Sequence, residues 1–560
     1  MAYFLKQTPL KGRTYLSIVE SFYDSNKKGT AHKVYKSLSS IETLKKKGIE
    51  DPVAYYQKEV DKLNSERQLK EVELISETSP NRYIGYFLAK AVMNKLDVKK
   101  VIDLFDLSTN YKFDLYEVFS SLVYARLVKP CSKYKTYYEV IPYLGYKINF
   151  TYQQIIEALK FYGLNYEKFV ELFTKATKDK YKLNTDTTYF DCTNFYFEID
   201  REDDFRKNGP SKENRKCPIV GLGLLLDANL IPIGMKMYPG NQSEKPVLRE
   251  IIKDLKVQNN IDGKTIHVAD KGLNCAKNIF AAKKNGDGYL FSKSVKMLPE
   301  IEETWILLNN DYKEVKDSDG NTLYFYKSCI DNFPYTYTDE DSGKTYRFEI
   351  KEKRLVTYNP SLAKKKHFEI DRMVEKARGL CASKAKRDEY GESSKYVDFK
   401  GKDGSKVEVS INEDKIKRDK MLAGFNILVT SETNMKDEDI YNTYHNLWRI
   451  EESFRIMKSD LDARPVFLQT EESIKGHFLI CYVAVLLERI LQFKIFENKF
   501  SSNELYNFFK NYKVVKGKSE YTNTTSDNNF IREVTKFTNL PLRNLYLSPA
   551  QFERILNYKL

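Results

Sequence analysis

The chain contains 560 residues, which predicts three or four structural units at roughly one domain per 150 residues. Hydrophobic residues make up 41% and charged residues 30% of the chain, so a disordered or fibrous protein is excluded. Lys and Arg number 92 against 78 Asp and Glu, and the net charge of +14 is spread along the chain. This charge permits a polyanionic partner such as nucleic acid, although it could serve solubility alone.

The cysteine content and the apolar runs restrict the compartment. Seven cysteines without a CxxC pair exclude a disulfide scaffold and a structural zinc site, so a reducing compartment fits best. The N-terminus has no apolar core of the kind found in signal peptides. The longest apolar run, 478–487, is much shorter than the roughly 20 residues of a membrane span, which predicts a buried helix and no membrane partner.

In chain order, residues 1–80 are expected to form an N-terminal strand pair and a connector. Alternating polar and apolar residues at 14–19 and 32–38 predict two strands, and the polar turn between them begins at Asp24. The Lys- and Glu-rich residues 41–80 predict a helix.

Residues 81–180 carry apolar residues at spacings of three and four, which predicts a helical domain with helices at 115–127 and 152–174. Residues 126–135, between these helices, combine basic side chains with a proline and a tyrosine. Short helices with basic and aromatic loops are typical of DNA-binding domains, although a packing domain has the same pattern. We expect this domain to bind DNA.

Residues 181–295 predict the first part of a mixed α/β core. Three antiparallel strands are expected first, followed by two strands that crossover helices separate. The first of these helices should begin after Ser243, which is a suitable N-cap. The predicted strands lie at 189–199, 218–226, 231–238, 265–269 and 288–292.

The remaining chain divides into three parts. Residues 296–420 predict a β-rich insertion with its own small sheet, and residues 421–495 predict the second part of the core. Residues 496–560 form a C-terminal region without a distinctive pattern. The strand-like segments of the insertion are 322–326, 344–350, 395–399 and 406–411, and the core returns with a strand at 425–430 and helical regions at 437–461 and 474–495.

Three acidic residues lie where a site is expected. Asp191 is inside an aromatic strand, although Asp is depleted from strands. Asp270 ends a short apolar strand, and ligands of open α/β sheets gather at the carboxyl ends of strands. Glu451 lies on a predicted helix. Asp186 competes with Asp191 for the first position, and each of these residues could instead be an ordinary edge or surface charge.

The helix around Glu451 has a polar stripe beside an apolar face. Tyr444, Glu451 and Lys458 are spaced by seven residues, which in a regular helix returns to nearly the same direction. This stripe would lie on the shoulder of a buried surface, where a carboxylate can reach the edge of a sheet. The apolar face consists of Leu447, Ile450, Phe454, Met457 and Leu461.

Four segments, in this order along the chain, resemble bacterial insertion-sequence DDE transposases. They are FDCTNFYFE (190–198), PGNQSE (239–244), VADKGL (268–273) and YHNLWRIEESFRIMK (444–458). The closest resemblance is to the group with a tyrosine-arginine-glutamate-lysine signature and a β-rich insertion before the catalytic glutamate. It extends from the N-terminal strand pair to about residue 495.

The resemblance implies an RNase H-like mixed sheet with flanking helices. It implies that Asp191, Asp270 and Glu451 are the catalytic residues and that they hold two Mg²⁺ or Mn²⁺ ions. The arginine of the signature would fall at position 447, where this chain has Leu. The residues expected to contact DNA phosphates are Tyr444, Lys458, Arg449 and Arg455.

The implied reaction is hydrolysis at the ends of the element, which exposes 3′-hydroxyls that then attack target DNA. The expected partners are double-stranded DNA, as terminal inverted repeats and target, and a second copy of the chain in a homodimer on DNA. The expected location is the bacterial cytoplasm, at the nucleoid. Two alternatives stay open: a nuclease of the same core without strand transfer, and an inactive DNA-binding descendant.

Overall fold

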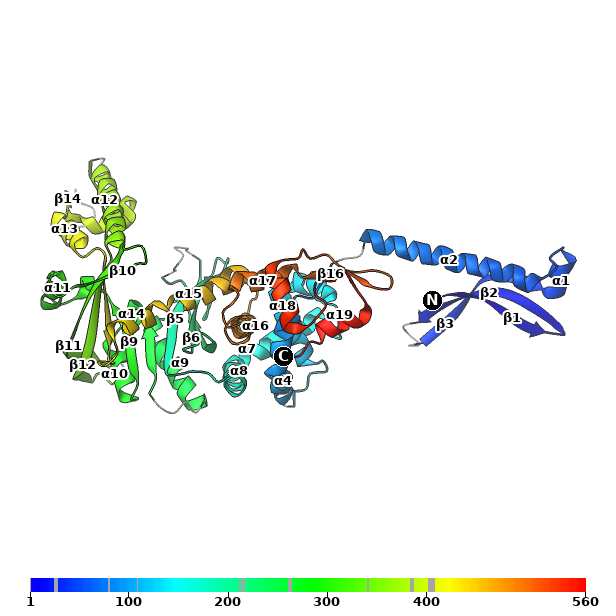
Figure 1. The fold of residues 1–560 in the computed structure, drawn as a ribbon, viewed down its shortest axis with the longest axis horizontal. Helices are drawn as coiled ribbons and strands as arrows, with labels where there is room; N and C mark the ends of the chain where they lie inside the picture. The colour runs from blue at the N-terminus through cyan, green and yellow to red at the C-terminus, as the bar shows by residue number, and fades with distance from the viewer. Residues whose placement is uncertain are drawn as a thin grey trace. The chain divides into compact units, whose positions relative to one another are not determined.

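The computed structural model describes residues 2–24, 29–78, 81–107, 109–210, 212, 217–259, 264–339, 342–382, 387–400 and 408–560. Their internal contacts divide the chain into two compact units (Figure 1). The first comprises Met1–Phe87, Tyr143–Tyr146 and Phe508–Tyr558, and the second comprises Leu88–Pro142, Lys147–Asn507 and Lys559–Leu560.

The first unit contains an antiparallel sheet of order β1-β2-β3 near the N-terminus. Its elements are β1 (Tyr3–Leu10), β2 (Arg13–Asp24), β3 (Gly29–Ser40), α1 (Ile41–Lys46) and α2 (Pro52–Thr78). The two predicted strands and the helical stretch are confirmed, and β1 is an additional strand that the sequence pattern did not predict. The turn expected after Asp24 lies outside the described residues.

A second sheet of the first unit has the order β18-β17-β16-β4. Gly85 follows its edge strand, and a Cβ at this position would overlap the backbone of Phe508 and Phe509. A glycine is therefore required for this close approach. The elements are β4 (Asn81–Tyr83), β16 (Lys513–Lys516), β17 (Tyr521–Asn523), β18 (Tyr546–Leu547), α18 (Asn529–Thr538) and α19 (Pro549–Leu556), with α17 (Ser502–Asn511) at the boundary of the units.

The second unit is built on a nine-stranded mixed sheet of order β10-β11-β12-β15-β9-β8-β5-β6-β7. β5, β6 and β7 are antiparallel, whereas β8 pairs in parallel with both β5 and β9. Helices α9 (Glu244–Asn259) and α10 (Ala276–Lys284) connect the parallel strands. The predicted element order and the mixed α/β, RNase H-like fold are confirmed. The core strands are β5 (Thr187–Tyr196), β6 (Ile219–Leu226), β7 (Pro232–Pro239), β8 (Ile266–Ala269), β9 (Gly288–Lys293) and β15 (Phe425–Thr430).

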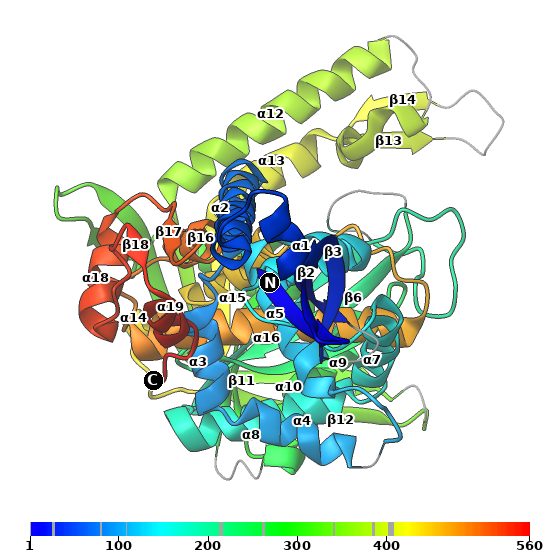
Figure 2. The same ribbon diagram turned by 90° about the vertical axis from the view of Figure 1, so that its right-hand side faces the viewer.

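The expectation that residues 296–420 form their own small sheet is wrong for most of their strands. β12 pairs with β15 over six residues of each strand, so β10, β11 and β12 continue the core sheet. Within the described residues, β13 and β14 alone form a separate pair, grouped with α12 and α13 (Figures 1 and 2). The bounds are α11 (Glu300–Leu307), β10 (Lys313–Lys316), β11 (Thr322–Thr338), β12 (Thr345–Tyr358), α12 (Pro360–Ala382), β13 (Val397–Lys400), β14 (Glu408–Ile411) and α13 (Glu413–Met421).

Helices pack beside the sheet around the buried helix α16 (Glu471–Ile490), which contacts α5, α7, α8 and β7. A Cβ on Gly163 of α7 would overlap the Glu472 carbonyl, and a Cβ on Gly476 would overlap the Leu159 carbonyl. None of the described helices combines the length and the apolar character that a membrane crossing requires. The other helices are α3 (Phe87–Lys95), α4 (Val98–Asp106), α5 (Leu115–Val128), α6 (Lys133–Lys135), α7 (Tyr152–Leu164) and α8 (Tyr166–Tyr181), so the helix expected at 152–174 is interrupted at Asn165.

The helical region expected at 437–461 is not one regular helix. It consists of α14 (Asp437–His445), α15 (Trp448–Arg455) and the π-helical segment η6 (Ile456–Asp460). The amides of Leu447 and Ile450 bond to carbonyls three residues back, the tighter 3₁₀ pattern. The rotation per residue therefore varies, and a single straight stripe along this region is a wrong expectation. The predicted apolar face is confirmed, because all five of its residues are buried.

Candidate active site

Asp191 and Asp270, two of the predicted acidic residues, lie side by side at the parallel strands β5 and β8. The register of β5 and β8 pairs Phe190 with Ala269, so Asp191 and Asp270 are the next residues on the two strands. Burial is the main cause that raises the pKa of Asp191, and the negative charge of Asp270 adds a smaller contribution. The structure therefore brings Asp191 and Asp270 together.

Asp191 lies in a mostly buried environment close to the cation Lys212. Its side chain is 19% exposed, and Oδ1 accepts a hydrogen bond from the backbone N–H of Cys192 at 2.7 Å. Burial raises the pKa of Asp191 to about 6, although the Lys212 ammonium, 3.8 Å from Oδ1, opposes this shift. A carboxyl with this pKa is mostly ionised at neutral pH and can act as an oxygen ligand.

Lys212 links Asp191 to Glu244 in the first turn of α9. Its ammonium lies 3.4 Å from Glu244 Oε1 and donates a hydrogen bond to the Cys192 carbonyl. The charge of Glu244 also raises the pKa of Asp191. The carboxylate of Asp191 is therefore held between a cation and two other acidic groups.

Asp270 accepts two hydrogen bonds from hydroxyl groups. Ser292 Oγ on β9 donates to Oδ1 at 2.9 Å, and the Tyr444 hydroxyl on α14 donates to the same oxygen at 3.0 Å. Burial, together with the charge of Asp270, raises the pKa of Tyr444, so this hydroxyl stays protonated as a donor. The predicted Tyr444 therefore reaches the acidic pair through Asp270.

Alternate residues of β5 point to opposite faces of the sheet. Phe190 and Cys192 are part of the buried cluster that includes the apolar face of α9. Asp191 therefore shares the other face of the strand with Tyr189 and Phe195. Figure 1 shows α14 and α15 beside the sheet.

Contacts on this face place the Glu451 region alongside β5. The Asn446 side chain lies close enough to Tyr189 to lower the pKa of its hydroxyl, which burial raises, and Lys458 Nζ lies 5.4 Å from the centre of the Phe195 ring. Between these contacts α15 packs against β5. The backbone of Glu451 thus runs past the middle of the strand, and its side chain is exposed.

The two predicted arginines pair with acidic residues three and five positions further along the chain. Arg449 Nη1 lies 3.4 Å from Glu452 Oε2, and its guanidinium stacks on Trp448 with 3.8 Å to the ring centre. Arg455 Nη1 lies 3.1 Å from Asp460 Oδ2. These contacts are local and do not join either arginine to the acidic pair.

The carboxylates of Asp191 and Asp270 can be compared with the ligands that the divalent ions implied by the resemblance require. Mg²⁺ and Mn²⁺ prefer carboxylate oxygens, and the adjacent Asp191 and Asp270 fit this preference. Across the described ranges, however, no three His, Cys, Asp or Glu side chains come close enough to form a closed metal-binding group. The acidic pair therefore fits an ion, and the role of Glu451 as a third ligand stays a prediction.

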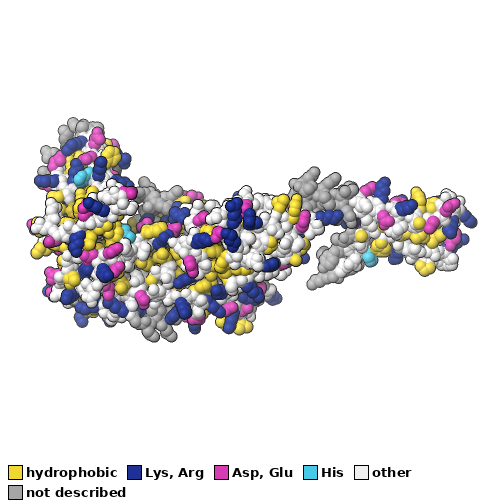
Figure 3. Space-filling model, in the orientation of Figure 1, with side chains coloured by type: hydrophobic (Ala, Val, Ile, Leu, Met, Phe, Trp, Pro, Cys, Tyr) yellow, Lys and Arg dark blue, Asp and Glu magenta, His cyan; other side chains and the backbone are white. Residues whose placement is uncertain are grey.

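A cavity of about 590 Å³ lies beside the acidic pair. It is lined by Lys212 and Glu244, by Gly272 from the loop after Asp270, and by Asn241 and Gln242 of the PGNQSE segment. The segment that carried part of the resemblance therefore forms a polar wall next to the candidate site. On the face shown in Figure 3, Lys and Arg side chains are interspersed with acidic ones.

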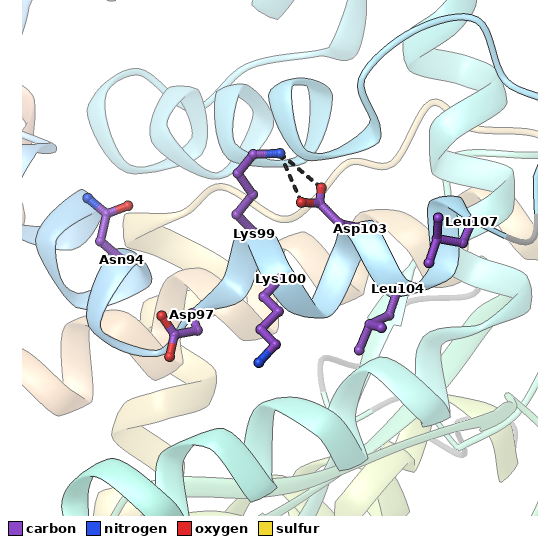
Figure 4. A pocket seen from close by; sticks show the side chains of 7 residues that line it. All are labelled: Asn94, Asp97, Lys99, Lys100, Asp103, Leu104 and Leu107. Carbon is purple, nitrogen blue, oxygen red and sulfur yellow. Dashed lines mark hydrogen bonds and ion pairs between the residues drawn. The ribbon is translucent and has the colours of Figure 1, made fainter.

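A separate hollow of about 450 Å³ lies on α4, and three of its charged residues form ion pairs (Figure 4). Lys99 pairs with Asp103 at 2.9 Å, and Asp97 pairs with Lys180 at 3.2 Å. Leu104, which lines this hollow, is more than half exposed. The residues that line this hollow lie between positions 94 and 107. They therefore belong to none of the strands that carry the acidic pair.

The mixed sheet with its adjacent acidic pair defines an RNase H-like catalytic domain. A model of the transposase DDE domain family matches residues 185–487, more than half of the chain, and this range contains Asp191, Asp270 and Glu451. The chain belongs to this family and is a DDE transposase of the insertion-sequence type. No curated protein matches the chain.

Sequence reasoning missed two residues that contact the acidic pair. Lys212 precedes the paired strand β6 in a polar stretch that has no distinguishing pattern. Ser292 belongs to a predicted strand, and only the pairing of β9 with β8 places it beside Asp270. Knowledge of the strand order, rather than of the local sequence, is needed to find Ser292.

Proposed function

We propose that this protein cleaves the ends of an insertion sequence and transfers the exposed 3′-hydroxyls to target DNA. The observation that carries the proposal is the adjacency of Asp191 and Asp270 on parallel strands within the matched transposase domain. The hydrogen bond from the Tyr444 hydroxyl to Asp270 adds support, because it links the segment YHNLWRIEESFRIMK to this pair.

Asp191, Asp270 and Glu451 would hold two Mg²⁺ or Mn²⁺ ions through carboxylate oxygens. Such ions, when bound, activate the attacking oxygen and stabilise the leaving oxygen of a phosphodiester. Tyr444 orients Asp270 through its hydrogen bond, and Ser292 fixes the same carboxylate from the sheet. These two donors reduce the freedom of Asp270, which keeps a ligand oxygen in place.

Double-stranded DNA is the proposed partner, as terminal repeats and as target. Lys458, Arg449 and Arg455 would contact DNA phosphates, and the net charge of +14 supports a polyanionic partner. Because two ends must be joined, the active form would be a homodimer on DNA. The proposed place of action is the bacterial cytoplasm, at the nucleoid.

The experiment that tests the proposal is a cleavage and strand-transfer assay with Mg²⁺ and a duplex that carries the inverted repeat flanking the gene. Asp191→Asn should reduce cleavage by at least about a thousandfold, because a neutral amide is a poor divalent-ion ligand. DNA binding by this variant should stay within about twofold of wild type. A gel that resolves cleaved ends and joined products provides the measurement.

Asp186→Asn is the matched control, since Asp186 is an exposed carboxylate just before the same strand. It should cleave like the wild type. Equal cleavage by Asp191→Asn and wild type would refute the assignment. Cleavage without joined products would favour the nuclease, and DNA binding without either reaction would favour the inactive descendant.

A further inference from the structure

A second cavity, of about 570 Å³, lies between the loop Pro130–Lys135 and the segment 462–468. Its volume is within the range of about 300–1,000 Å³ that is typical of ligand pockets. The loop is the basic and aromatic stretch that the sequence singled out, and no residue of the proposed catalytic set lines the cavity. The cavity is therefore distinct from the proposed catalytic set.

One wall of this cavity is formed by Lys133, a buried lysine that has no acidic partner among the described residues. Lys133 is 7% exposed, and its ammonium donates to Nδ1 of His477 at 3.0 Å. His477 Nε2 lies 3.1 Å from the Ala463 carbonyl and must donate to it, so Nδ1 is the acceptor. Among the described residues, Lys133 makes no ion pair and no other hydrogen bond, which leaves two of its three donor positions unused.

A second buried cation stands beside Lys133. Arg126 is 4% exposed and donates to the carbonyls of Leu461, Asp462 and Cys131 at 3.1–3.3 Å. These partners are neutral, and within the described part of the chain no carboxylate bonds to this guanidinium. Burial and the charge of Arg126 together hold the pKa of Lys133 well below its ordinary value. Two buried cations without a counter-charge are costly unless an anion binds there.

The rim of the cavity presents aromatic rings to solvent. Tyr134 is 60% exposed and Phe467 is 67% exposed, and both line the cavity. Tyr152 lines it as well, with its ring centre 5.7 Å from that of Tyr134. Exposed rings beside a cationic wall are the arrangement that binds a nucleotide by stacking and phosphate contact.

The cavity is connected to the proposed catalytic centre through the chain. Residues 462–468 follow η6 directly, the segment whose Lys458 lies over β5. Arg464, within this segment, lies 5.3 Å from the centre of the Tyr196 ring, at the end of the strand that carries Asp191. The segment that forms this wall of the cavity therefore runs beside β5, the strand that carries Asp191.

We propose that this cavity binds one nucleotide of a DNA strand, with a phosphate at Lys133 and the base against Tyr134 and Phe467. The site is separate from the acidic pair and relies on the proposed function only for the expectation that DNA is the polyanion. A free nucleotide has the same phosphate and base chemistry, so the experiment must distinguish the two sources.

The test measures binding of the full-length chain to a short fluorescein-labelled duplex with a single-stranded overhang, in EDTA. Lys133→Gln should weaken binding at least about fivefold between about 50 and 200 mM salt, and should lower the slope of log Kd against log salt by about one. Lys129→Gln is the matched control, because Lys129 is an exposed lysine of the same loop that does not line the cavity. This control should stay within about twofold of wild type.

Equal weakening by Lys129→Gln and Lys133→Gln would overturn the proposal, because diffuse surface charge would then explain both losses. Thermal melting checks that Lys133→Gln folds, and its Tm should be unchanged or higher because a buried cation is removed. Tyr134→Ala provides a second test against Tyr138→Ala, which also removes an exposed tyrosine from the loop region but one that does not line the cavity. Only Tyr134→Ala should weaken binding, and equal effects would overturn the stacking contact.

Deoxyadenosine monophosphate is the probe for the other source. The nucleotide could raise the Tm of the wild type but not that of Lys133→Gln, while the two proteins bind the labelled DNA equally. In that case the cavity binds a free nucleotide, and the proposal is overturned. Because EDTA removes divalent ions and the assay measures binding alone, it does not depend on ion binding or cleavage at the acidic pair. A failure of the catalytic proposal therefore leaves the result at Lys133 unaffected.

Discussion

The hydroxyl of Tyr444 connects α14, where the segment YHNLWRIEESFRIMK begins, to the acidic pair through a single hydrogen bond. It donates to Asp270 Oδ1 at 3.0 Å, and the Ser292 hydroxyl donates to the same oxygen. A hydrogen bond to a charged group contributes about 1.5–3 kcal/mol, of which part would affect the orientation of the carboxylate. Tyr444 is therefore expected to act as a positioning residue rather than by direct contact with DNA alone.

Tyr444→Phe should lower the rate of DNA cleavage about tenfold, which corresponds to about 1.4 kcal/mol in activation free energy. The matched control is Tyr441→Phe, because Tyr441 lies on the same helix and stacks on Tyr324 and His445. The measurement is single-turnover cleavage with excess enzyme, together with Mn²⁺ affinity. If Tyr441→Phe loses as much activity as Tyr444→Phe, the hydrogen bond to Asp270 is not the cause.

At the residue scale, the sequence predicted Asp191, Asp270 and Tyr444, and the structure brings these three together. Their positions in an aromatic strand and at a strand end made Asp191 and Asp270 candidates, and the resemblance of the four motifs selected them over ordinary charged residues. Lys212 could not be predicted, because it contacts Asp191 from a stretch far along the chain. Such contacts depend on tertiary structure, which a local pattern does not contain.

At the scale of elements, the close packing of α7 and α16 rests on two glycines. A Cβ on Gly163 would overlap the Glu472 carbonyl, and a Cβ on Gly476 would overlap the Leu159 carbonyl. Backbone atoms in packed helices cannot yield as a flexible side chain can. The helices would have to separate to accept an added methyl group.

Gly163→Ala should lower the free energy of unfolding by about 3 kcal/mol or more, at the upper end of overpacking effects. Gly379→Ala is the matched control, because Gly379 lies inside α12 with open space around its Cβ position. This control should raise stability by about 0.5–1 kcal/mol, since alanine is the better helix former. Urea denaturation followed by circular dichroism measures both values, and a neutral Gly163→Ala would contradict the close packing.

Individual strands and helices were predicted correctly where the apolar periodicity was strong. The prediction failed where strand pairing determines the arrangement of the strands. The strand at 425–430 and the antiparallel set β5, β6 and β7 were predicted from alternation and turn residues. The junction of β12 with β15 was not, because alternation does not specify which strand is the neighbour. The break between α14 and α15 was also missed, since apolar spacing continues through it.

At the scale of the whole molecule, the sequence predicted an RNase H-like mixed sheet, and the family match agrees with it. The order of four motifs along the chain carried this prediction, because each motif alone is short. The convergence of distant acidic residues is the part that no sequence pattern measures. Asp191 and Asp270 converge, while Glu451 lies on the helix beside their strand with its side chain exposed.

The central claim is that Asp191, Asp270 and Glu451 bind divalent ions as one set. Titration of the full-length chain with Mn²⁺, followed by electron paramagnetic resonance of the free ion, tests this claim without DNA or activity. Asp191→Asn and Glu451→Gln should each weaken Mn²⁺ binding at least about tenfold, because each removes a carboxylate ligand. Asp186→Asn should bind like the wild type. Mn²⁺ affinity that is the same in all four proteins would contradict the claim.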